Sequence, residues 1–275
     1  MKKAKQHFFN IGFLLKESVL CLFLFLFTNC GLDDFYILEA AYTDGHMVYY
    51  DTAASNDRYF SFITSETGAN SDYLAVASSF KFQGTEVYYK IYNNYSTLSS
   101  VASSISSLNT VSNYSAAAEK LIDTYGYKTL KFSSGSFTPL VKADGTNKYV
   151  YIKLTTVDKD TPPCICVGNE KMSVYDASKA LKYNGQNVLP RRNITSSSQA
   201  PQGYSFDFKI NNDEENRTPL ETDEDVSYSS SSTEDGTWYV DMYAISQGYD
   251  TTYTMTYSLV YYMGVCAIVE GSTNN

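Results

Sequence analysis

The sequence predicts a mainly β protein made of two tandem antiparallel β-sandwich domains, the first with a helical hairpin inserted into it. Three observations lead to this prediction. Short runs of Tyr, Phe, Val, Ile and Thr recur along the chain, and these bulky or branched side chains pack well on a pleated surface. Residues typical of turns separate the runs. A clear helical period occurs at about residues 96–125.

Residues 1–29 form a predicted lipoprotein signal peptide. Four lysines precede or flank the apolar run Val19–Phe27, which is less than half as long as the ~20 residues that a membrane-spanning helix needs. Extending this run backwards would bring Lys16 and Glu17 into the bilayer at a high cost in free energy. The pattern therefore favours a signal that is removed over a helix that stays in the membrane.

Cys30 follows this segment directly and precedes Gly31. We expect Cys30 to be lipidated, with palmitate among its acyl chains, and to become the N-terminus of the mature protein. Acyl chains would then hold the protein on a membrane. The alternative is an ordinary secretory signal peptide with an incidental cysteine, and Cys21 inside the apolar run shows that incidental cysteines occur here.

The composition of the remaining 246 residues excludes some partners. They carry 17 basic and 29 acidic side chains, a net charge of −12, because the first 29 residues hold four lysines and one glutamate. Such a chain has no electrostatic basis for binding nucleic acid. Anionic lipid headgroups would also repel it, which agrees with a domain held away from the membrane by a tether.

Residues 30–138 form the first predicted domain. After a start at Phe35–Ala41, short strands are expected at Met47–Tyr50, Tyr59–Ile63, Tyr73–Phe82 and Gly84–Asn94. In the last of these strands Val87, Tyr89 and Ile91 alternate with other residues, so they share one face.

A helical hairpin interrupts the strands of this domain. In Ser96–Asn109 the apolar residues recur at intervals of three and four, which predicts a helix with a serine-rich outer face. A second helix is expected from about Ser115 to Tyr125, with Gly126 ending it. The chain then returns to a strand at Tyr127–Phe132.

Residues 139–275 form the second predicted domain. Pro139 to Gly145 marks the boundary, with Asp144-Gly145 as a hairpin turn. Strands are expected at Tyr149–Thr155, Ile165–Val167, Tyr204–Ile210, Trp238–Ile245 and Tyr253–Val269, and a short helix at Val174–Tyr183. The acidic stretch Asp213–Asp225 should be an exposed loop. Its spacing matches no calcium-binding loop.

Two late strands carry most of the information about the core. Trp238, Val240 and Met242 alternate with Tyr239 and Asp241, so we expect the first set to face inward and the second to face solvent. The run from residue 238 to 243 can be laid over the run from 87 to 92, and a Gly-Thr pair precedes both. This similarity suggests two domains of one kind.

The segment Gly236–Gly248 with the following Tyr257-Ser258 resembles the late strand pair of a fibronectin type III or related immunoglobulin-like sandwich. In that family a Tyr-x-Val-x-x-x-Ala strand ends at a glycine, and the next strand carries a serine. More broadly, the Cys-Gly-Leu-Asp start, the Tyr-Tyr-Lys-Ile-Tyr strand and the helices after it resemble uncharacterised lipoproteins of treponemes, which are spirochaetes. The resemblance implies location and fold, and it implies no catalytic residue.

Three cysteines remain beside Cys30. Cys164 and Cys166 lie two residues apart in an extended run and point to the same face, which disfavours a bond between them. If a disulfide forms, Cys266 is expected to pair with Cys164 or Cys166, on the strand adjacency that the sandwich resemblance implies. Buried free thiols are the alternative. A zinc site is not expected, because three thiols lack a fourth ligand.

The sequence predicts no catalytic residue, no cofactor site and no metal site. Metalloprotease, nucleophile-elbow and phosphate-loop motifs are absent, and His46, in a predicted turn, is the only histidine after the signal peptide. The favoured function is a non-enzymatic binding or structural module, lipid-anchored in a bacterial cell envelope at the outer membrane or surface. Its expected partners are the membrane and a host protein or glycan. The alternative is a carbohydrate-binding module or carbohydrate-active enzyme of the envelope.

Overall fold

The computed structural model groups Ile37–Asn275 into one compact unit. The residues it describes are 36–52, 57–74, 79–132, 138–155, 162–172, 176–194, 203–208, 216–234 and 236–271. The predicted signal peptide and Cys30 lie outside these residues. The described chain is mainly β, as predicted. None of its helices is long and apolar enough to cross a membrane.

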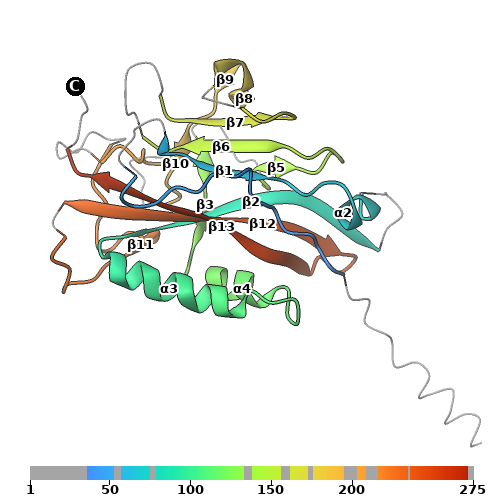
Figure 1. Cartoon of the computed structure of the whole chain (residues 1–275), viewed down its shortest axis with the longest axis horizontal. Coiled ribbons are helices and arrows are strands. Elements are labelled where there is room, and N and C mark those ends of the chain that lie inside the picture. Colours follow the sequence, from blue (N-terminus) through green and yellow to red (C-terminus); the bar gives the residue numbers. More distant parts are fainter. Residues whose placement is uncertain are drawn as a thin grey trace, which may run out of the picture. The chain divides into compact units, whose positions relative to one another are not determined.

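A sheet of six strands forms the centre of the fold (Figure 1). Its longest strands are neighbours in the order β2, β12, β13, all antiparallel, and short strands pair along β2. The strands of this sheet are β2 (Phe80–Tyr92), β3 (Lys128–Thr129), β5 (Val141–Lys142), β11 (Val226–Ser227), β12 (Thr237–Asp250) and β13 (Met255–Val269).

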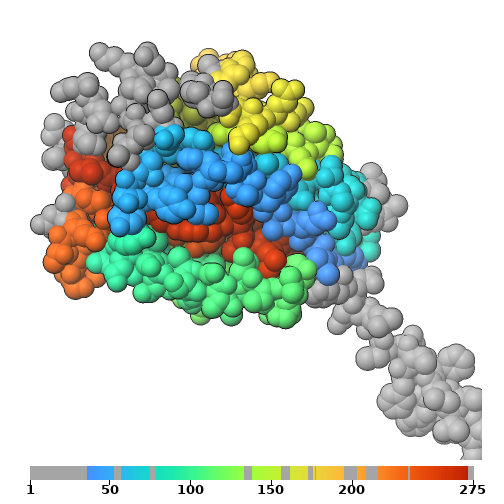
Figure 2. All heavy atoms as spheres, viewed as in Figure 1, coloured from blue at the N-terminus to red at the C-terminus, as the bar shows by residue number. Residues whose placement is uncertain are grey.

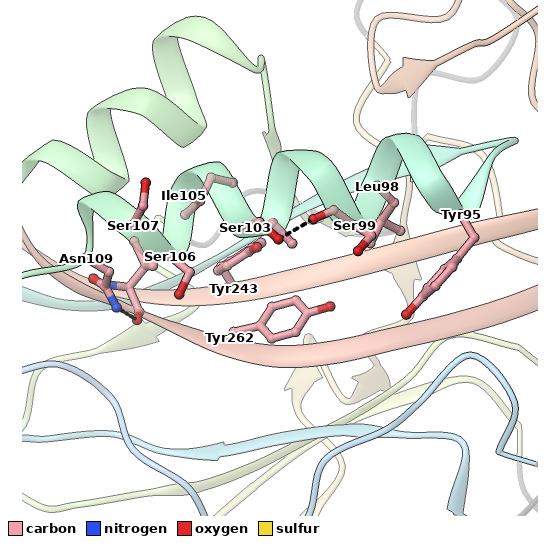
Figure 3. A pocket seen from close by; sticks show the side chains of 12 residues that line it. Tyr95, Leu98, Ser99, Ser103, Ile105, Ser106, Ser107, Asn109, Tyr243 and Tyr262 are labelled. Atoms are coloured by element: carbon pink, nitrogen blue, oxygen red, sulfur yellow. Dashed lines mark hydrogen bonds between the residues drawn. The ribbon is translucent and has the colours of Figure 1, made fainter.

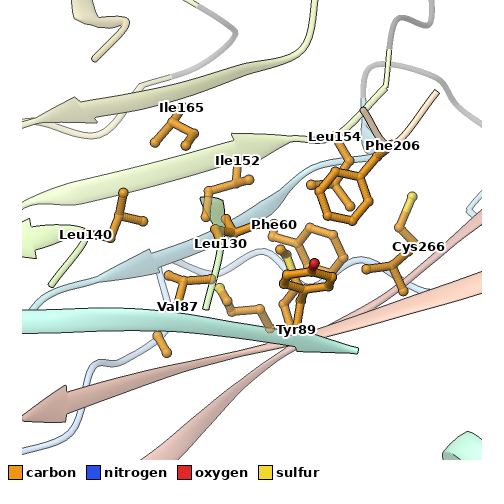
Figure 4. Close-up of a cluster of buried hydrophobic side chains, with 14 of the residues drawn as sticks. Phe60, Val87, Tyr89, Leu130, Leu140, Ile152, Leu154, Ile165, Phe206 and Cys266 are labelled. Carbon is orange, nitrogen blue, oxygen red and sulfur yellow. The ribbon is translucent and has the colours of Figure 1, made fainter. Parts of the chain in front are cut away.

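A second sheet covers one face of the central sheet. It runs in the order β1 (Phe60–Ile63), β6 (Tyr149–Lys153), β7 (Cys164–Gly168). The main hydrophobic core lies between the two sheets (Figure 4). Val87, Tyr89 and Ile91 point into it from β2, and Trp238, Val240 and Met242 point into it from β12. The predicted inward face of each strand is thereby confirmed.

Two helices cover the opposite face of the central sheet (Figure 1). They are α3 (Tyr95–Leu108) and α4 (Ala116–Glu119), which continues as the π-helical turn Lys120–Thr124. Both predicted helices are confirmed, and β3 after them pairs with β2 before them. The helices bury Leu98, Ile105 and Leu121 against tyrosines of the sheet. The sheet is therefore covered on both faces.

This second layer corrects an expectation about β12. Tyr239 and Asp241 were predicted to face solvent, but Tyr239 is 7% exposed and Asp241 is fully buried. The alternation of the strand is as predicted. The error lies in assuming that the second face meets water, because a strand covered on both faces needs no polar side.

Tandem fibronectin-type sandwiches with a boundary at residue 139 are not confirmed. Strand β2 from the first half pairs with β12 from the second half along their whole length, with Tyr92 opposite Tyr239 and Val87 opposite Ala244. The two similar runs, 87–92 and 238–243, are therefore neighbours in one sheet. Their likeness reflects a shared position between the same two layers, which calls for the same alternation of aromatic and aliphatic residues.

Several local predictions also differ from the structure. The expected strand from Tyr73 is preceded by the single helical turn α2 (Ala69–Asp72), and β2 begins only at Phe80. Asp144-Gly145 does not join a hairpin, because β5 pairs with β2 whereas β6 pairs with β1 and β7. Where Tyr204–Ile210 was expected to be a strand, Tyr204 makes one isolated bridge to Arg192, and residues 209–210 lie outside the described chain.

The helix expected at Val174–Tyr183 is wrong in its described part, which forms a 3₁₀ turn and the first strand of a hairpin. Residues 173–175 lie outside the described chain, and a 3₁₀ turn at Ala177–Lys179 leads into a small hairpin. The hairpin pairs β8 (Lys182–Tyr183) with β9 (Gln186–Asn187). A separate short pair joins β4 (Lys131–Phe132) to β10 (Pro190–Arg191).

Candidate functional site

A solvent-open groove of about 650 Å³ runs between helix α3 and strands β12 and β13. This volume lies within the range of small-molecule sites. Figure 3 places Tyr95 at one end of α3 and Asn109 at the other, with Tyr243 and Tyr262 between them on the sheet side. In Figure 2 the red atoms of β13 are seen between the green helical layer and the blue segment that follows Ile37.

Helix α3 forms one wall of the groove, and both of its ends are fixed. At its start the side chain of Asn94 accepts a hydrogen bond from the Thr97 amide at 2.8 Å, which caps the helix. Just after its end the Asn109 side chain exchanges two hydrogen bonds with the backbone of Val260 in β13, each 2.9 Å long. This wall is therefore held at a set distance from the sheet.

The helix presents hydroxyl groups to the groove. Four exposed serines line it: Ser99, Ser103, Ser106 and Ser107. The Ser103 hydroxyl donates to the Ser99 carbonyl at 2.8 Å, and its oxygen keeps acceptor capacity for a ligand. The serine-rich outer face recognised in the sequence is thus the rim of a groove.

Tyrosines form the aromatic part of the site. Tyr262 packs on Tyr243 with ring centroids 4.9 Å apart, and Tyr95 packs on Tyr239 at 5.5 Å. Tyr50 lies 4.2 Å from Tyr95 and extends the aromatic surface outwards. These rings are tilted by 39° to 56° and do not form a flat platform. Of these rings, Tyr95, Tyr243 and Tyr262 line the groove itself.

The groove is electrically neutral. None of its lining residues carries a carboxylate, an amine, a guanidinium or an imidazole. Within the described chain, the hydroxyls of Tyr95 and Tyr262 have no hydrogen-bond partner. Burial raises the pKa of Tyr262 above its usual value, so this hydroxyl stays protonated. The site can exchange hydrogen bonds and pack on apolar surface, and it offers no acid–base pair for catalysis.

The one histidine predicted in a turn plays no part in the groove. His46 stacks on Tyr59 with ring centroids 3.9 Å apart, and its Nε2 lies 3.0 Å from the Tyr59 carbonyl oxygen. No group of three or more metal-binding side chains, counting His, Cys, Asp and Glu, occurs in the described part of the chain.

A buried ion-pair network lies away from the groove and corrects part of the prediction that Asp213–Asp225 is an exposed loop. Residues 213–215 lie outside the described chain, and Glu221 is exposed as predicted. Asp223 and Asp225 are buried, and Arg192, fully buried as well, binds both carboxylates at 2.7–2.8 Å. Arg217 adds a second pair with Asp223 at 2.6 Å, and Tyr89 donates to Asp225 at 2.7 Å. The two cations Arg192 and Arg217 balance the charges of Asp223 and Asp225. We interpret these four residues as a structural ion-pair network and call them the brace.

The electrostatics of Asp223 agree with this role. Burial acts to raise its pKa, but hydrogen bonds from Arg217 and the Leu220 amide, with the charge of Arg192, hold the pKa of that carboxyl below its usual value. Asp223 is therefore ionised at neutral pH and paired. Sequence reasoning missed this pairing because Arg192 lies some thirty residues before its partners.

Two further carboxyls are buried on the helix-covered face of the sheet. Burial raises the pKa of Glu86 to about 8 and that of Asp241 to about 8. The Tyr127 hydroxyl donates to Asp241 Oδ2 at 2.8 Å. Both side chains are therefore largely protonated, and so uncharged, at pH 7.

Cys164, Cys166 and Cys266, for which a disulfide and buried free thiols were the two alternatives, are all buried free thiols. Cys266 lies in the main core (Figure 4), whereas Cys164 and Cys166 belong to a separate cluster on the far face of β7. The expected pairing of Cys266 is not formed, because β7 and β13 belong to different sheets and are not neighbours.

Comparison with protein-family models, with curated proteins and with solved structures finds no match for this chain.

Proposed function

We propose that this chain is a lipid-anchored, non-enzymatic binding protein of a bacterial cell envelope, held at the outer membrane or surface through Cys30. The groove between α3 and β13 is its ligand site. One observation supports this function above all: a groove of about 650 Å³ is lined by tyrosine rings and serine hydroxyls, without an ionisable group other than tyrosine.

The chemistry of the groove fits a neutral glycan. Sugar rings have apolar C–H faces that pack on aromatic side chains, and their hydroxyls both donate and accept hydrogen bonds. Tyr95 and Tyr262 offer such rings, and the serines of α3 offer hydroxyls that also both donate and accept. A charged ligand would lose hydration in the groove without meeting an opposite charge.

A protein partner is the second candidate, and the exposed tyrosines favour it. Tyr49 is 60% exposed and Tyr50 is 43% exposed beside the groove. Tyrosine is enriched at protein interfaces because it combines a large apolar surface with a polar tip. Contact with a host protein at this surface would also serve an adhesion role.

A glycan screen with the intact protein in detergent micelles tests the proposal. The screen needs one arm of neutral oligosaccharides and one of acidic oligosaccharides, with a set of extracellular matrix proteins as a third arm. We expect hits in the neutral arm.

A matched pair of variants assigns the hits to the groove. Ser103 and Ser100 are both exposed on α3, and each donates its hydroxyl to the carbonyl four residues earlier. Only Ser103 lines the groove. Ser103→Trp should weaken binding more than about tenfold by filling the site, whereas Ser100→Trp should leave it unchanged.

Two results would overturn the proposal. Hits confined to acidic glycans would contradict a neutral site. Hits among neutral glycans that survive in Ser103→Trp would place the ligand elsewhere. Binding only to matrix proteins would favour the second candidate.

A further inference from the structure

The far face of strand β7 carries two thiols side by side. Cys164 and Cys166 alternate with Ile165, which points into the main core, so both cysteines lie on the opposite face of the strand. Their Sγ atoms are 3.9 Å apart, and both thiols are free. Side chains two residues apart on a strand stay in register on one face, so the backbone itself fixes this pair.

A third sulfur atom belongs to the same cluster. Met172 packs with Cys164, Cys166 and Ala180 into a small buried cluster, and Met172 is 9% exposed at its margin. Cys166 and Ala180 form an isolated backbone bridge, which brings the segment around Asp176 close to the Cys166 thiol. The backbone carbonyl of Asp176 accepts a weak hydrogen bond from Cys166 Sγ at 3.7 Å. The sulfur atoms of this cluster belong to two thiols and one thioether.

We propose that Cys164, Cys166 and Met172 form a binding site for a soft monovalent metal ion, Cu(I). Thiolate and thioether ligands select this ion over harder cations. With metal–sulfur bonds of about 2.3 Å, as for zinc thiolates, a sulfur separation of 3.9 Å gives a sulfur–metal–sulfur angle of about 116°. That angle is close to trigonal, so a third sulfur ligand completes the coordination.

The donor set discriminates against zinc. Structural zinc sites are tetrahedral and need four ligands, and thioether sulfur is not among the usual ones. The cluster supplies two thiols and one thioether. Cu(I) accepts three soft ligands, so the argument that excludes zinc does not exclude copper.

Charge balance at the site is also favourable. Binding of Cu(I) replaces the two thiol protons, which leave to solvent, and no electron is transferred. Two thiolates and one Cu(I) then carry a net charge of −1. Lys153 lies directly opposite Cys164 across the strands and is buried on the same face, so a cation stands beside the site.

The test is a competition titration of Cu(I) against a chromophoric chelator under anaerobic, reducing conditions. The intact protein in detergent should withdraw one Cu(I) per chain. Cys164→Ser and Cys166→Ser should each lose this stoichiometric binding. Met172→Leu removes a direct ligand and should weaken the affinity at least about tenfold, which is the lower end of the losses seen even for residues outside the ligand shell.

Cys266 provides the matched control. It is another buried free thiol, but it lies in the main core apart from the cluster. Cys266→Ser should retain full Cu(I) binding. X-ray absorption on the unmodified protein should place sulfur atoms near 2.3 Å and no nitrogen or oxygen in the first shell, a readout that needs no variant to fold.

Three results of the titration and the spectroscopy would overturn the site. They are failure to compete for Cu(I), equal binding by Cys266→Ser and Cys164→Ser, and an absorption spectrum with nitrogen or oxygen ligands. A Cys164–Cys166 disulfide in protein taken from its native envelope would also overturn it, because the thiols would then be unavailable to the metal.

Discussion

The buried carboxyl of Asp241 makes the stability of this protein depend on pH in a defined direction. In the folded chain its pKa is about 8, against about 3.9 in an unfolded chain. Between these values the folded state keeps a proton that the unfolded state has lost. The stabilising contribution is therefore fully present below about pH 4 and is lost as the pH rises through about 8.

The size of the effect follows from the same two values. One proton released on unfolding lowers the free energy of unfolding by about 1.4 kcal/mol per pH unit. Between pH 5 and pH 7 Asp241 alone should therefore remove about 3 kcal/mol. Glu86, with a pKa of about 8, acts in the same direction and should add a similar loss.

Urea denaturation of the protein and of Asp241→Asn at pH 5, 6, 7 and 8 measures this loss. The amide preserves an acceptor for the Tyr127 hydroxyl and cannot ionise. The difference in free energy of unfolding between the two proteins should shift by about 1.4 kcal/mol per pH unit from pH 5 to pH 7, in favour of the variant as the pH rises, and by less from pH 7 to pH 8 because the folded state then begins to lose its proton.

Asp250→Asn is the control on the same strand. Asp250 is the last residue of β12 and is half-buried, and hydrogen bonds from Thr252 and Thr254 in the turn that follows lower its pKa. Its contribution changes only in acid, so the difference for this variant should be flat from pH 5 to pH 8. A flat difference for Asp241→Asn as well would mean that the buried carboxyl is ionised, and would refute the reasoning.

Three further predictions concern the anchor, the core and the brace. Cys30→Ala should abolish metabolic acyl labelling and release the protein from membranes, and unchanged labelling would contradict lipidation. Trp238→Ala should lower the free energy of unfolding by about 3–5 kcal/mol in urea titration, because Trp238 is 6% exposed and lies in the main core. As the control, Tyr253→Ala at a 78% exposed position should change the free energy of unfolding by less than about 0.5 kcal/mol. Arg192→Ala removes the cation that pairs with Asp223 and Asp225, and should lower the free energy of unfolding by about 3–5 kcal/mol. A loss below about 1 kcal/mol would show that the network contributes little to stability.

Local patterns predicted the elements of this fold better than their arrangement. The intervals between Leu98, Ile105 and their neighbours predicted α3, and the alternation through Trp238 and Met242 predicted the inward face of β12. These signals depend on neighbours within one or two turns, which the sequence displays directly.

The pairing of β2 with β12 had no such signal. Tyr92 and Tyr239 are far apart in the chain, and the helices α3 and α4, the strands β6 and β7 and several loops lie between them in sequence. A tyrosine in a strand also does not indicate whether its face of the sheet is buried or exposed, because its ring packs well in a core and its hydroxyl is compatible with water. The outward prediction for Tyr239 failed for this reason.

The candidate site was predicted only in its parts. The serine face of α3 and the wealth of tyrosine were visible, but the groove arises because Asn109 fixes the helix to Val260 of a strand about 150 residues later. The brace was hidden similarly. An acidic run is expected to be exposed to solvent unless a cation is known to pair with it. No local sequence pattern indicates that Arg192 lies beside Asp223 and Asp225.

Hydrogen–deuterium exchange with the strongest glycan from the screen tests most directly whether the groove is the binding site. Bound ligand should slow exchange in α3, residues 95–108, and in β13, residues 255–262, because these segments form its walls. Exchange in β6 and β7 should not change, since the second sheet lies across the core. Protection that appears on β6 and β7, or on neither wall of the groove, would contradict the account.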